Sequence, residues 1–337
     1  MLRAAVIGLG VGEQHIAGYE SDSRCEVTTL CDFDAPKLAQ VASRHPGKNL
    51  AHSAEDVLTN PDIDVVSIAT YEDMHCEQVV AAVETGKHVF VEKPLCLSFA
   101  ELERVVRSLR ENPKVRLSSN LILRKTPRFI ELKRQVEEGY LGDLYYLEGD
   151  YDYGRLHKLT DGWRGQLPGY SVVHGGGIHL IDLLCWLHDD VVAEVFAYGN
   201  KTFSQGTVFH GNDLVVALLR FKKGLVAKIT ANFGCVAPHF HRLSVYGSLG
   251  TFQQSHSGAS YIFSRDPQAP PTILNDDYPG SAKGDMLPSF VRSILDGTTP
   301  DVTAQEVIDV MSVSLAVERS LSTGLPERVS YLQINKT

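Results

Sequence analysis

Lys93 lies where a charged side chain could take part in chemistry. It belongs to the triplet Glu92-Lys93-Pro94, directly after the β-branched and aromatic run His88–Val91, which predicts a short buried strand. In open parallel sheets, ligands bind outside the carboxyl ends of the strands. An ammonium group there can stabilise negative charge that develops on a reacting oxygen. The alternative is an ordinary surface Glu-Lys pair that closes a strand.

A second candidate lies in the segment from His174 to Trp186, where three glycines separate two histidines. Apolar residues recur at positions 180, 181, 183, 184 and 187, so a helix is predicted to start near Gly177. His179 and Asp182 then lie one turn apart at its amino-terminal end. An imidazole titrates near neutrality and suits a general base, which Asp182 would orient unless it only caps a turn.

A metal site is the rival interpretation of His174, His179 and Asp182, and His239 and His241 offer two further imidazoles. Zinc or iron needs ligands that converge from fixed backbone positions, whereas His174 precedes a triple glycine that we expect to be flexible. No metal is therefore expected. On a strand, we expect one of the rings of His239 and His241 to face a substrate cleft and the other to point away.

A glycine-rich turn follows the predicted first strand, residues 2–7. The residues Gly8-Leu9-Gly10-Val11-Gly12 precede a helix that begins near Glu13, and strand, glycine turn and helix are the context of a dinucleotide fingerprint. Gly8 permits a tight turn, and Gly10 lets the backbone approach a pyrophosphate, whose charge the helix amino terminus favours. Gly12 comes one residue early, so a turn that binds no ligand remains the alternative.

Asp32 ends the predicted second strand, residues 26–30, and lies twenty positions beyond Gly12. A carboxylate at this place can accept hydrogen bonds from the ribose hydroxyls of a bound dinucleotide. It would repel a 2′-phosphate, and no cation follows before Lys37, so NAD is favoured over NADP. Capping a helix suits Asp34 better, because Asp34 directly precedes the predicted helix 35–44.

The rest of the first half alternates between predicted helices and strands. We expect helices at 53–58, 75–85 and 99–111, and strands at 64–70 and 115–117; the strand at 64–70 ends in Ala69-Thr70-Tyr71. This alternation predicts an α/β domain with a parallel sheet covered on both faces. The domain should cover residues 1–120, and residues 121–337 should form the second domain.

The second half is predicted to begin with a helix that is followed by strands. The helix should run over 126–139, and short β-rich segments bounded by turn residues predict strands at 144–152, 191–198, 213–221, 225–233, 242–247 and 250–254. Lys222-Lys223-Gly224 should form a hairpin turn between two of them.

An aromatic and basic segment follows the predicted strand 144–152 and should form a loop. It contains Tyr153, Arg155, Lys158 and Arg164. Arginines beside aromatic rings suit a substrate with phosphate or carboxylate groups and a ring-shaped body. The alternative is a loop whose arginines pair with nearby carboxylates.

Size and charge restrict the function further. The chain has 337 residues, enough for two domains, and its net charge of −9 argues against a general nucleic-acid surface. Six widely spaced cysteines indicate reduced thiols in a cytoplasmic protein. The apolar start is too short to span a membrane.

The first half resembles the Gfo/Idh/MocA family of NAD(P)-dependent oxidoreductases. The matches are Gly8-x-Gly10, Ala69-Thr70 followed by His75, Gly86-Lys87-His88-Val89 and Glu92-Lys93-Pro94. The resemblance implies a Rossmann domain and an α+β domain built on a large open mixed, mainly antiparallel sheet, which would pair subunits into a homodimer or homotetramer. The implied cofactor contacts are Gly8, Leu9, Gly10, Val11, Gly12, Asp32, Ala69, Thr70, Tyr71, His75, Glu92, Lys93 and Pro94.

The resemblance also implies roles for the two candidate sites. Lys93 and His179 match the family's catalytic residues, and the expected substrate contacts are Lys93, Tyr153, Arg155, Lys158, Arg164, His174, His179 and Asp182. Two departures concern the site: Tyr71 replaces a usual proline, and Gly175 stands where the family often carries an aspartate.

The expected activity is oxidation of a secondary hydroxyl of a sugar by NAD. Within the family, the basic segment favours a nucleotide-sugar, such as a UDP-hexosamine oxidised at the ring C3 hydroxyl. Three alternatives remain open: a dehydrogenase of free sugars or inositols, a glycosidase that uses NAD without net redox change, and a cofactor-sensing regulator without catalysis.

Overall fold

The computed structural model describes residues 1–278 and 280–335 and divides into two compact units. The first unit contains Met1–Lys125 and Ser281–Met311, together with the described residues from Tyr331 onward. The second contains residues from Thr126 to Gly280 and Ser312–Ser330. The sequence suggested a division at residue 120, whereas in the structure the chain returns to the first unit at Ser281, passes to the second again at Ser312 and returns to the first at Tyr331.

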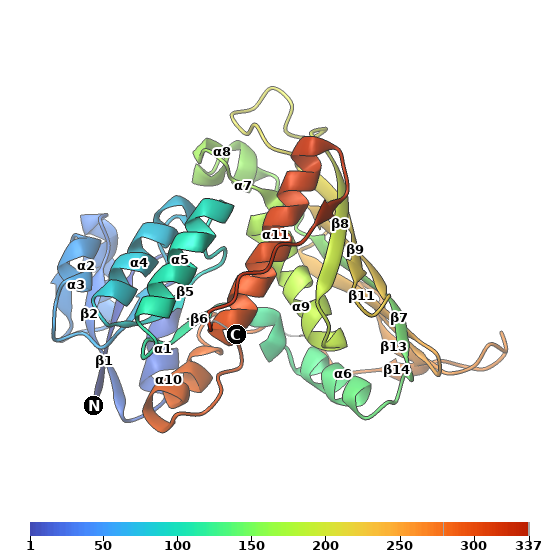
Figure 1. Cartoon of the computed structure of the whole chain (residues 1–337), viewed down its shortest axis with the longest axis horizontal. Coiled ribbons are helices and arrows are strands. Elements are labelled where there is room, and N and C mark those ends of the chain that lie inside the picture. Colours follow the sequence, from blue (N-terminus) through green and yellow to red (C-terminus); the bar gives the residue numbers. More distant parts are fainter. Residues whose placement is uncertain (279, 336–337) are drawn as a thin grey trace. The chain divides into compact units, whose positions relative to one another are not determined.

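The first unit is built on a six-stranded parallel sheet with the order β3-β2-β1-β4-β5-β6. The order reverses between β1 and β4, and such a switch point is where open α/β sheets bind ligands. Helices connect successive strands, and α4 and α5 lie side by side (Figure 1). The strands are β1 (Leu2–Ile7), β2 (Cys25–Cys31), β3 (Asn49–Ala51), β4 (Val65–Ile68), β5 (His88–Val91) and β6 (Leu117–Ser119).

Local signals set most helix boundaries in this unit. The Asp34 side chain accepts a hydrogen bond from the Lys37 amide at 3.0 Å and caps α2 as predicted. Ser98 accepts from the Glu101 amide at the start of α5. The helices are α1 (Glu13–Glu20), α2 (Ala35–Arg44), α3 (Ala54–Leu58), η1 (Glu72–Met74), α4 (His75–Glu84), α5 (Phe99–Glu111), η2 (Ile122–Lys125) and α10 (Leu287–Asp296).

The second unit contains a nine-stranded mixed sheet with the order β14-β13-β12-β11-β7-β10-β9-β8-β15. Only the β7–β10 pair among the described ladders of this sheet is parallel. Its strands are β7 (Leu144–Asp152), β8 (Val192–Asn200), β9 (Leu214–Phe221), β10 (Val226–Asn232), β11 (Phe240–Gly247), β12 (Thr251–Ser255), β13 (Gly258–Ile262), β14 (Thr272–Leu274) and β15 (Glu327–Arg328).

Helices cover one face of this sheet, and α9 packs directly on β7 (Figure 1). A Cβ atom at Gly149 would lie 3.4 Å from the Leu180 side chain. Because Gly149 has no side chain, α9 can pack closely on β7. The helices are α6 (Pro127–Glu137), α7 (His157–Thr160), α8 (Trp163–Gln166), η3 (Val173–Gly177), α9 (Ile178–His188) and α11 (Ala304–Thr323), which begins in the first unit and ends in the second.

The structure corrects several boundaries. The predicted strand 115–117 is displaced, because β6 is Leu117–Ser119, and the predicted strand 64–70 is shortened to β4. The aromatic and basic segment is not a loop but contains α7 and α8. Gly224 has a φ of +98° in the hairpin between β9 and β10, as its turn position requires.

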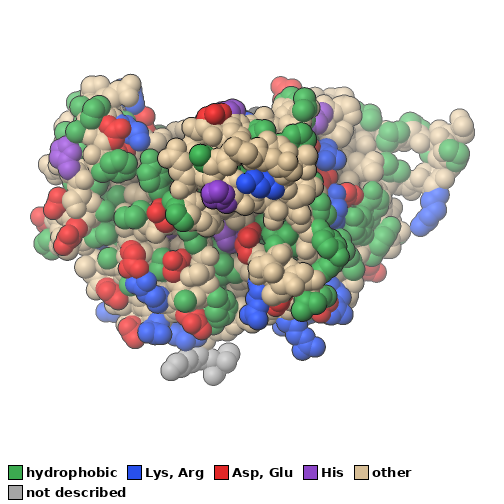
Figure 2. Space-filling view, turned by 90° about the horizontal axis from the view of Figure 1, so that it is seen from above, with side chains coloured by type: hydrophobic (Ala, Val, Ile, Leu, Met, Phe, Trp, Pro, Cys, Tyr) green, Lys and Arg blue, Asp and Glu red, His purple; other side chains and the backbone are tan. Residues whose placement is uncertain are grey.

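Acidic and basic side chains are interspersed on the face of the molecule that Figure 2 shows. Within the described residues, the structure contains no helix that is long and apolar enough to cross a membrane.

Candidate active site

The glycine-rich turn lies against the carboxyl end of β4. Gly8 has a φ of +87°, and a Cβ atom there would lie 2.4 Å from the Ala69 carbonyl oxygen. A Cβ atom at Gly12 would lie 2.2 Å from the Gly8 oxygen, whereas one at Gly10 would meet nothing within 4 Å. Gly8 and Gly12 therefore shape the turn, and Gly10 leaves room for a ligand. This shape fits a pyrophosphate at the amino terminus of α1 and accounts for the early third glycine.

Asp32 is buried at the end of β2 and connects that strand to the glycine turn. Its carboxylate accepts hydrogen bonds from the Leu9 amide at 2.9 Å and the Asp34 amide at 3.0 Å. The Lys37 Nζ atom lies 3.5 Å from the same carboxylate. Lys37 is the first cation after Asp32 in the sequence, and one turn of α2 brings it back to Asp32. The carboxylate is thus fixed where a ribose could bind.

Two exposed aromatic rings lie near the cofactor residues. Phe33 follows Asp32 and is 73% exposed, and Tyr71 follows β4 and is 40% exposed. Their ring centroids are 6.1 Å apart. Exposed aromatic rings are suited to stack on a flat heterocycle. Phe33 escaped the sequence analysis because only its acidic neighbours matched a motif.

His75 ties the loop that carries Lys93 to the loop after β4. Its Nδ1 atom lies 2.6 Å from the Pro94 carbonyl oxygen, and its Nε2 atom lies 3.2 Å from the Thr70 carbonyl oxygen. Burial lowers the pKa of His75. The Lys93–Pro94 peptide bond is cis. His75 therefore supports the Lys93 loop from within the unit instead of presenting its ring at the surface.

A buried polar cluster surrounds Glu92, the residue that precedes Lys93. The His15 Nδ1 atom is 2.6 Å from the Ser67 hydroxyl, its Nε2 atom is 3.3 Å from the Glu92 carboxylate, and Asn120 donates to the same carboxylate oxygen at 2.7 Å. Burial alone would raise the pKa of Glu92, but the hydrogen bond to His15 and the charges of Lys283 and Lys93 hold it far below its ordinary value. Glu92 therefore stays ionised beside Lys93 at neutral pH.

The cluster predicts a stability effect. Replacing His15 by phenylalanine removes one partner of a buried carboxylate and is expected to cost about 3–5 kcal/mol in the free energy of unfolding. His15→Gln keeps a polar partner and should cost clearly less. The exposed His52 provides the control, because His52→Phe should change the free energy by less than about 0.5 kcal/mol. Urea unfolding measures all three, and equal losses for both His15 variants would contradict the role of His15 as a polar partner of Glu92.

In the second unit, the triple glycine is a buried helical turn. It forms η3, a π-helical turn that continues into α9. A Cβ atom at Gly175 would lie 2.1 Å from the Tyr170 hydroxyl, and one at Gly176 would lie 2.5 Å from the Tyr151 ring. The expectation of a flexible segment is therefore wrong: these glycines are needed because two aromatic side chains occupy the space beside them.

His174 and Asp182 are held in the interior of the second unit. His174 is 2% exposed, and its Nδ1 atom lies 2.8 Å from the Ser314 hydroxyl of α11. Asp182 is fully buried on α9. Both side chains are thus placed to support α9 from within.

His179 lies in a cluster of aromatic and imidazole rings around Tyr151 of β7. The ring centroid of Tyr151 is 6.2 Å from that of His179, with the planes 20° apart. The rings of Tyr153, Phe233, His239 and His241 also contact Tyr151, at centroid distances of 5.7, 6.0, 5.1 and 5.2 Å. We call these six residues the ring cluster.

The ring cluster corrects the expectation for His239 and His241. Both rings approach Tyr151, and their centroids are 4.9 Å apart. Residues two positions apart share one face of a strand, so the two rings should have been assigned to the same side. The same period of two would have identified Tyr151 from its neighbour Tyr153.

The basic residues reach the cluster only in part. The Arg155 guanidinium lies over the Tyr153 ring at 5.2 Å, and the Arg164 guanidinium lies over the Trp163 ring at 4.5 Å. Lys158 lies in α7. Arg155 is thus joined to the ring cluster through Tyr153, and Arg164 lies on a neighbouring aromatic side chain.

Within residues 1–278 and 280–335, no three His, Cys, Asp or Glu side chains are arranged to hold a metal ion. His179, His239 and His241 belong to the ring cluster, and the His241 Nδ1 atom also lies 3.1 Å from the Tyr278 hydroxyl. The rings of this cluster could stack on a ligand, and its imidazoles could transfer a proton.

Comparison with known proteins gives matches over both units. Residues 2–120 match the model described as an oxidoreductase family with an NAD-binding Rossmann fold, and residues 129–253 match the GFO/IDH/MocA C-terminal domain. A myo-inositol 2-dehydrogenase from Thermotoga maritima is 24% identical, with 95% of this chain and 96% of that protein covered. An NAD-dependent scyllo-inositol 2-dehydrogenase from Bacillus subtilis is 26% identical, with 96% and 95% covered.

Among solved structures, levoglucosan dehydrogenase in complex with NADH superposes with a TM-score of 0.86. The alignment covers 98% of this chain and all of that one, at 20% sequence identity. At this identity the likeness concerns the fold, and it confirms the predicted fold class of a Rossmann domain followed by a mainly antiparallel sheet.

Proposed function

Since the chain belongs to the Gfo/Idh/MocA oxidoreductase family, we propose that it is a dehydrogenase that oxidises a secondary hydroxyl of an uncharged cyclic polyol or sugar with NAD. The ring cluster around His179 carries the choice of substrate, because aromatic rings can cover the C–H face of a saturated ring while imidazoles contact its hydroxyls. The inositol dehydrogenases among its relatives support this free-substrate alternative. The comparisons do not support the nucleotide-sugar branch.

The first unit has the residues that would hold NAD. The glycine turn and the start of α1 would bind the pyrophosphate, Asp32 the adenosine ribose, and Phe33 and Tyr71 the adenine ring. Bound NAD supplies a hydride acceptor for the carbon that loses its hydrogen. In a cytoplasmic protein the six cysteines would stay reduced.

The chain's own residues would handle the oxygen and its proton. We assign to Lys93 the binding of the reacting oxygen and the stabilisation of negative charge on it. We assign to His179 the uptake of the hydroxyl proton, which leaves the imidazole protonated as the carbonyl forms. Glu92, held ionised by its buried partners, would keep the Lys93 ammonium group charged.

Cofactor preference should depend on Asp32. Asp32→Ala removes a charged acceptor for the ribose and is expected to lower kcat/KM for NAD by about 10–100-fold. The loss with NADP should be smaller, because repulsion of the 2′-phosphate disappears and Lys37 is released from its ion pair. Initial rates with both cofactors measure the effect, and Asp34→Asn serves as the neighbouring control. An equal loss with both cofactors would contradict the ribose role.

A panel assay tests the proposed activity. Purified protein and NAD are mixed with myo-inositol, scyllo-inositol, free sugars, an anhydrosugar and UDP-linked sugars, and formation of NADH is followed by absorbance. We expect turnover with at least one uncharged ring compound. Turnover only with UDP-linked sugars would overturn the substrate class. Glycoside cleavage without NADH would favour the glycosidase, and binding of NAD without any turnover would favour the regulator.

The nucleotide-sugar remains a second candidate because Arg155 lies against the ring cluster. If this candidate is right, replacing Arg155, Lys158 and Arg164 together by alanine should raise KM for a UDP-linked sugar by about tenfold or more, since each charged hydrogen bond contributes about 1.5–3 kcal/mol. KM for an uncharged sugar should stay within twofold to threefold, roughly. Equal effects on both substrates would exclude a diphosphate site there.

We also propose that the protein is a homodimer or homotetramer joined through the open face of the nine-stranded sheet. Tyr198, Leu218 and Val226 are 69%, 48% and 41% exposed on that face. The strand register places them with Arg220 and Lys228 on the side opposite to α9. Light scattering during size-exclusion chromatography gives the mass in solution, and a monomer would overturn this proposal.

A further inference from the structure

The hydroxyl of Tyr170 occupies the place of a side chain at position 175. A Cβ atom built on Gly175 would lie 2.1 Å from this hydroxyl and 2.8 Å from the ring carbon that bears it. The separation is too short for any residue but glycine to fit beside Tyr170. The family that this sequence resembles often carries an aspartate at this position. In this chain the phenol oxygen of Tyr170 fills the space instead.

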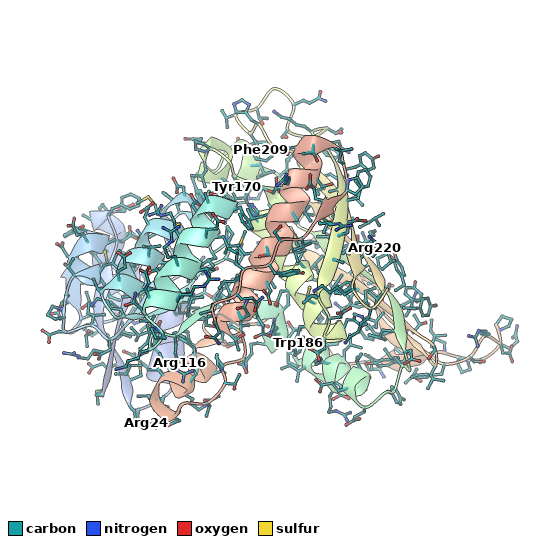
Figure 3. All side chains as sticks on the ribbon, in the orientation of Figure 1. Arg24, Arg116, Tyr170, Trp186, Phe209 and Arg220 are labelled. Carbon is teal, nitrogen blue, oxygen red and sulfur yellow. The ribbon has the colours of Figure 1, made fainter. Side chains whose placement is uncertain are left out.

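Neighbouring aromatic residues hold the Tyr170 ring in place. Tyr170 is 5% exposed, and its ring centroid lies 6.2 Å from that of Phe209 and 6.4 Å from that of Trp163. Figure 3 labels Tyr170 and Phe209 in the same region of the second unit. Both contacts are edge-on, which buries the ring and directs the hydroxyl toward η3. The oxygen is thus fixed by packing on the ring.

The place of this oxygen matters because Gly175 precedes His179 by about one helical turn. Side chains four positions apart lie above one another on a helix, with Cβ atoms about 5–6 Å apart. A helical side chain also leans back over the preceding turn, so the His179 imidazole is directed toward the surface at Gly175. The Tyr170 hydroxyl and the His179 imidazole are therefore expected on the same side of the turn that joins η3 to α9.

We propose that Tyr170 is a positioning residue whose hydroxyl oxygen accepts a hydrogen bond from the His179 imidazole and stabilises its protonated form. The inference rests on the proposed role of His179 as the general base. No bond of Tyr170 changes: the substrate hydroxyl loses its proton to the imidazole nitrogen, and the phenol keeps its own proton. Gly175 then has a functional reason, because a side chain at position 175 would displace the phenol oxygen.

The first test measures the titration of His179 and does not require turnover. Protein carrying ¹³C-labelled histidine is titrated by NMR, and the His179 signal is assigned by its loss in His179→Gln. In Tyr170→Phe, the His179 midpoint should fall, because a hydrogen bond to the charged form of a group favours that form. The variant retains the other titratable side chains around His179, which are His174 of η3, Asp182 of α9 and, in the ring cluster, Tyr151, Tyr153, His239 and His241.

A compensating variant separates this role from core packing. In the double variant Tyr170→Ala/Gly175→Asp, a carboxylate occupies the freed space, and the His179 midpoint should rise again. Tyr261→Phe is the matched control, because Tyr261 is another buried tyrosine of the second unit. An unchanged midpoint in folded Tyr170→Phe would overturn the inference, even if the double variant fails to fold.

Kinetics give the second readout. With the substrate found in the panel, Tyr170→Phe should lower kcat by about 10–100-fold and leave KM nearly unchanged, since a hydrogen bond to a charged group contributes about 1.5–3 kcal/mol. An unchanged kcat would overturn the inference. If no panel compound is turned over but the midpoint falls, the proposed activity fails while the Tyr170–His179 contact is upheld.

Discussion

Replacing Lys93 by methionine is expected to lower kcat by about 10²–10³-fold, the usual effect of removing one group that stabilises charge on a reacting oxygen. Methionine keeps most of the side-chain length and removes only the ammonium group. The NAD dissociation constant should change much less than kcat, because the glycine turn and Asp32 are untouched. Steady-state kinetics give kcat, and fluorescence titration gives the affinity for NAD.

The matched control for this variant is Lys114→Met, which alters an exposed lysine of the same unit. It should leave kcat unchanged. Glu92 does not titrate near neutrality, so the defect of Lys93→Met should be the same from pH 6 to about pH 9. A Lys93→Met variant with wild-type kcat on the substrate found in the panel would remove Lys93 from the chemistry.

Replacing His179 by alanine should also have a large effect. We expect kcat to fall by about 10²–10⁴-fold if the imidazole is the general base. The variant leaves a space beside the Tyr151 ring, where a free imidazole molecule could bind. Added imidazole should therefore restore part of the lost rate. Restoration should rise with pH as the added base loses its proton, because only the neutral form accepts a proton.

His210→Ala is the control, since His210 is an exposed histidine of the same unit. It should have full activity and no response to added imidazole. If His179→Ala retains wild-type turnover, His179 is not the base. If its lost activity is not restored by imidazole at any pH, a structural role for the ring would be favoured over proton transfer.

The sequence was most informative where a structural signal is local. The helix α2 has the predicted limits because Asp34 caps it through a residue three positions away. The strand β5 and the position of Lys93 at its end follow from a short run bounded by Gly86 and Pro94. Glycine turns, helix caps and apolar runs depend on residues that are close in the sequence, and so they can be predicted from the sequence.

Elsewhere the deciding contacts come from distant parts of the chain. Ser118 belongs to β6 although it is polar, because its hydroxyl donates to the Val302 carbonyl oxygen at 2.8 Å. The segment around α10 returns to the first unit and packs Phe290 against Phe90, with ring centroids 5.7 Å apart. No pattern near Ser118 could indicate Val302 as its partner, and no pattern near Phe90 could indicate Phe290.

The candidate site shows the same limit. His15 is far from Glu92 in the sequence, and its role depends on a buried contact with this carboxylate that only the folded unit reveals. Gly175 was noticed as a missing aspartate, but the phenol oxygen that fills its place comes from Tyr170. Glycines that admit bulky neighbours and glycines that confer flexibility look the same in a sequence, and the structure distinguishes them.

Net hydride transfer from a ring carbon is tested most directly with a deuterated substrate. The polyol or sugar found in the panel is labelled with deuterium at each candidate carbinol carbon in turn, and the nicotinamide product and the sugar product are analysed by mass spectrometry. We expect one labelled position to deliver its deuterium to NADH in a one-to-one ratio with the ketone formed. Deuterium retained in a cleaved sugar, without accumulation of NADH, would contradict the dehydrogenase and indicate transient redox chemistry.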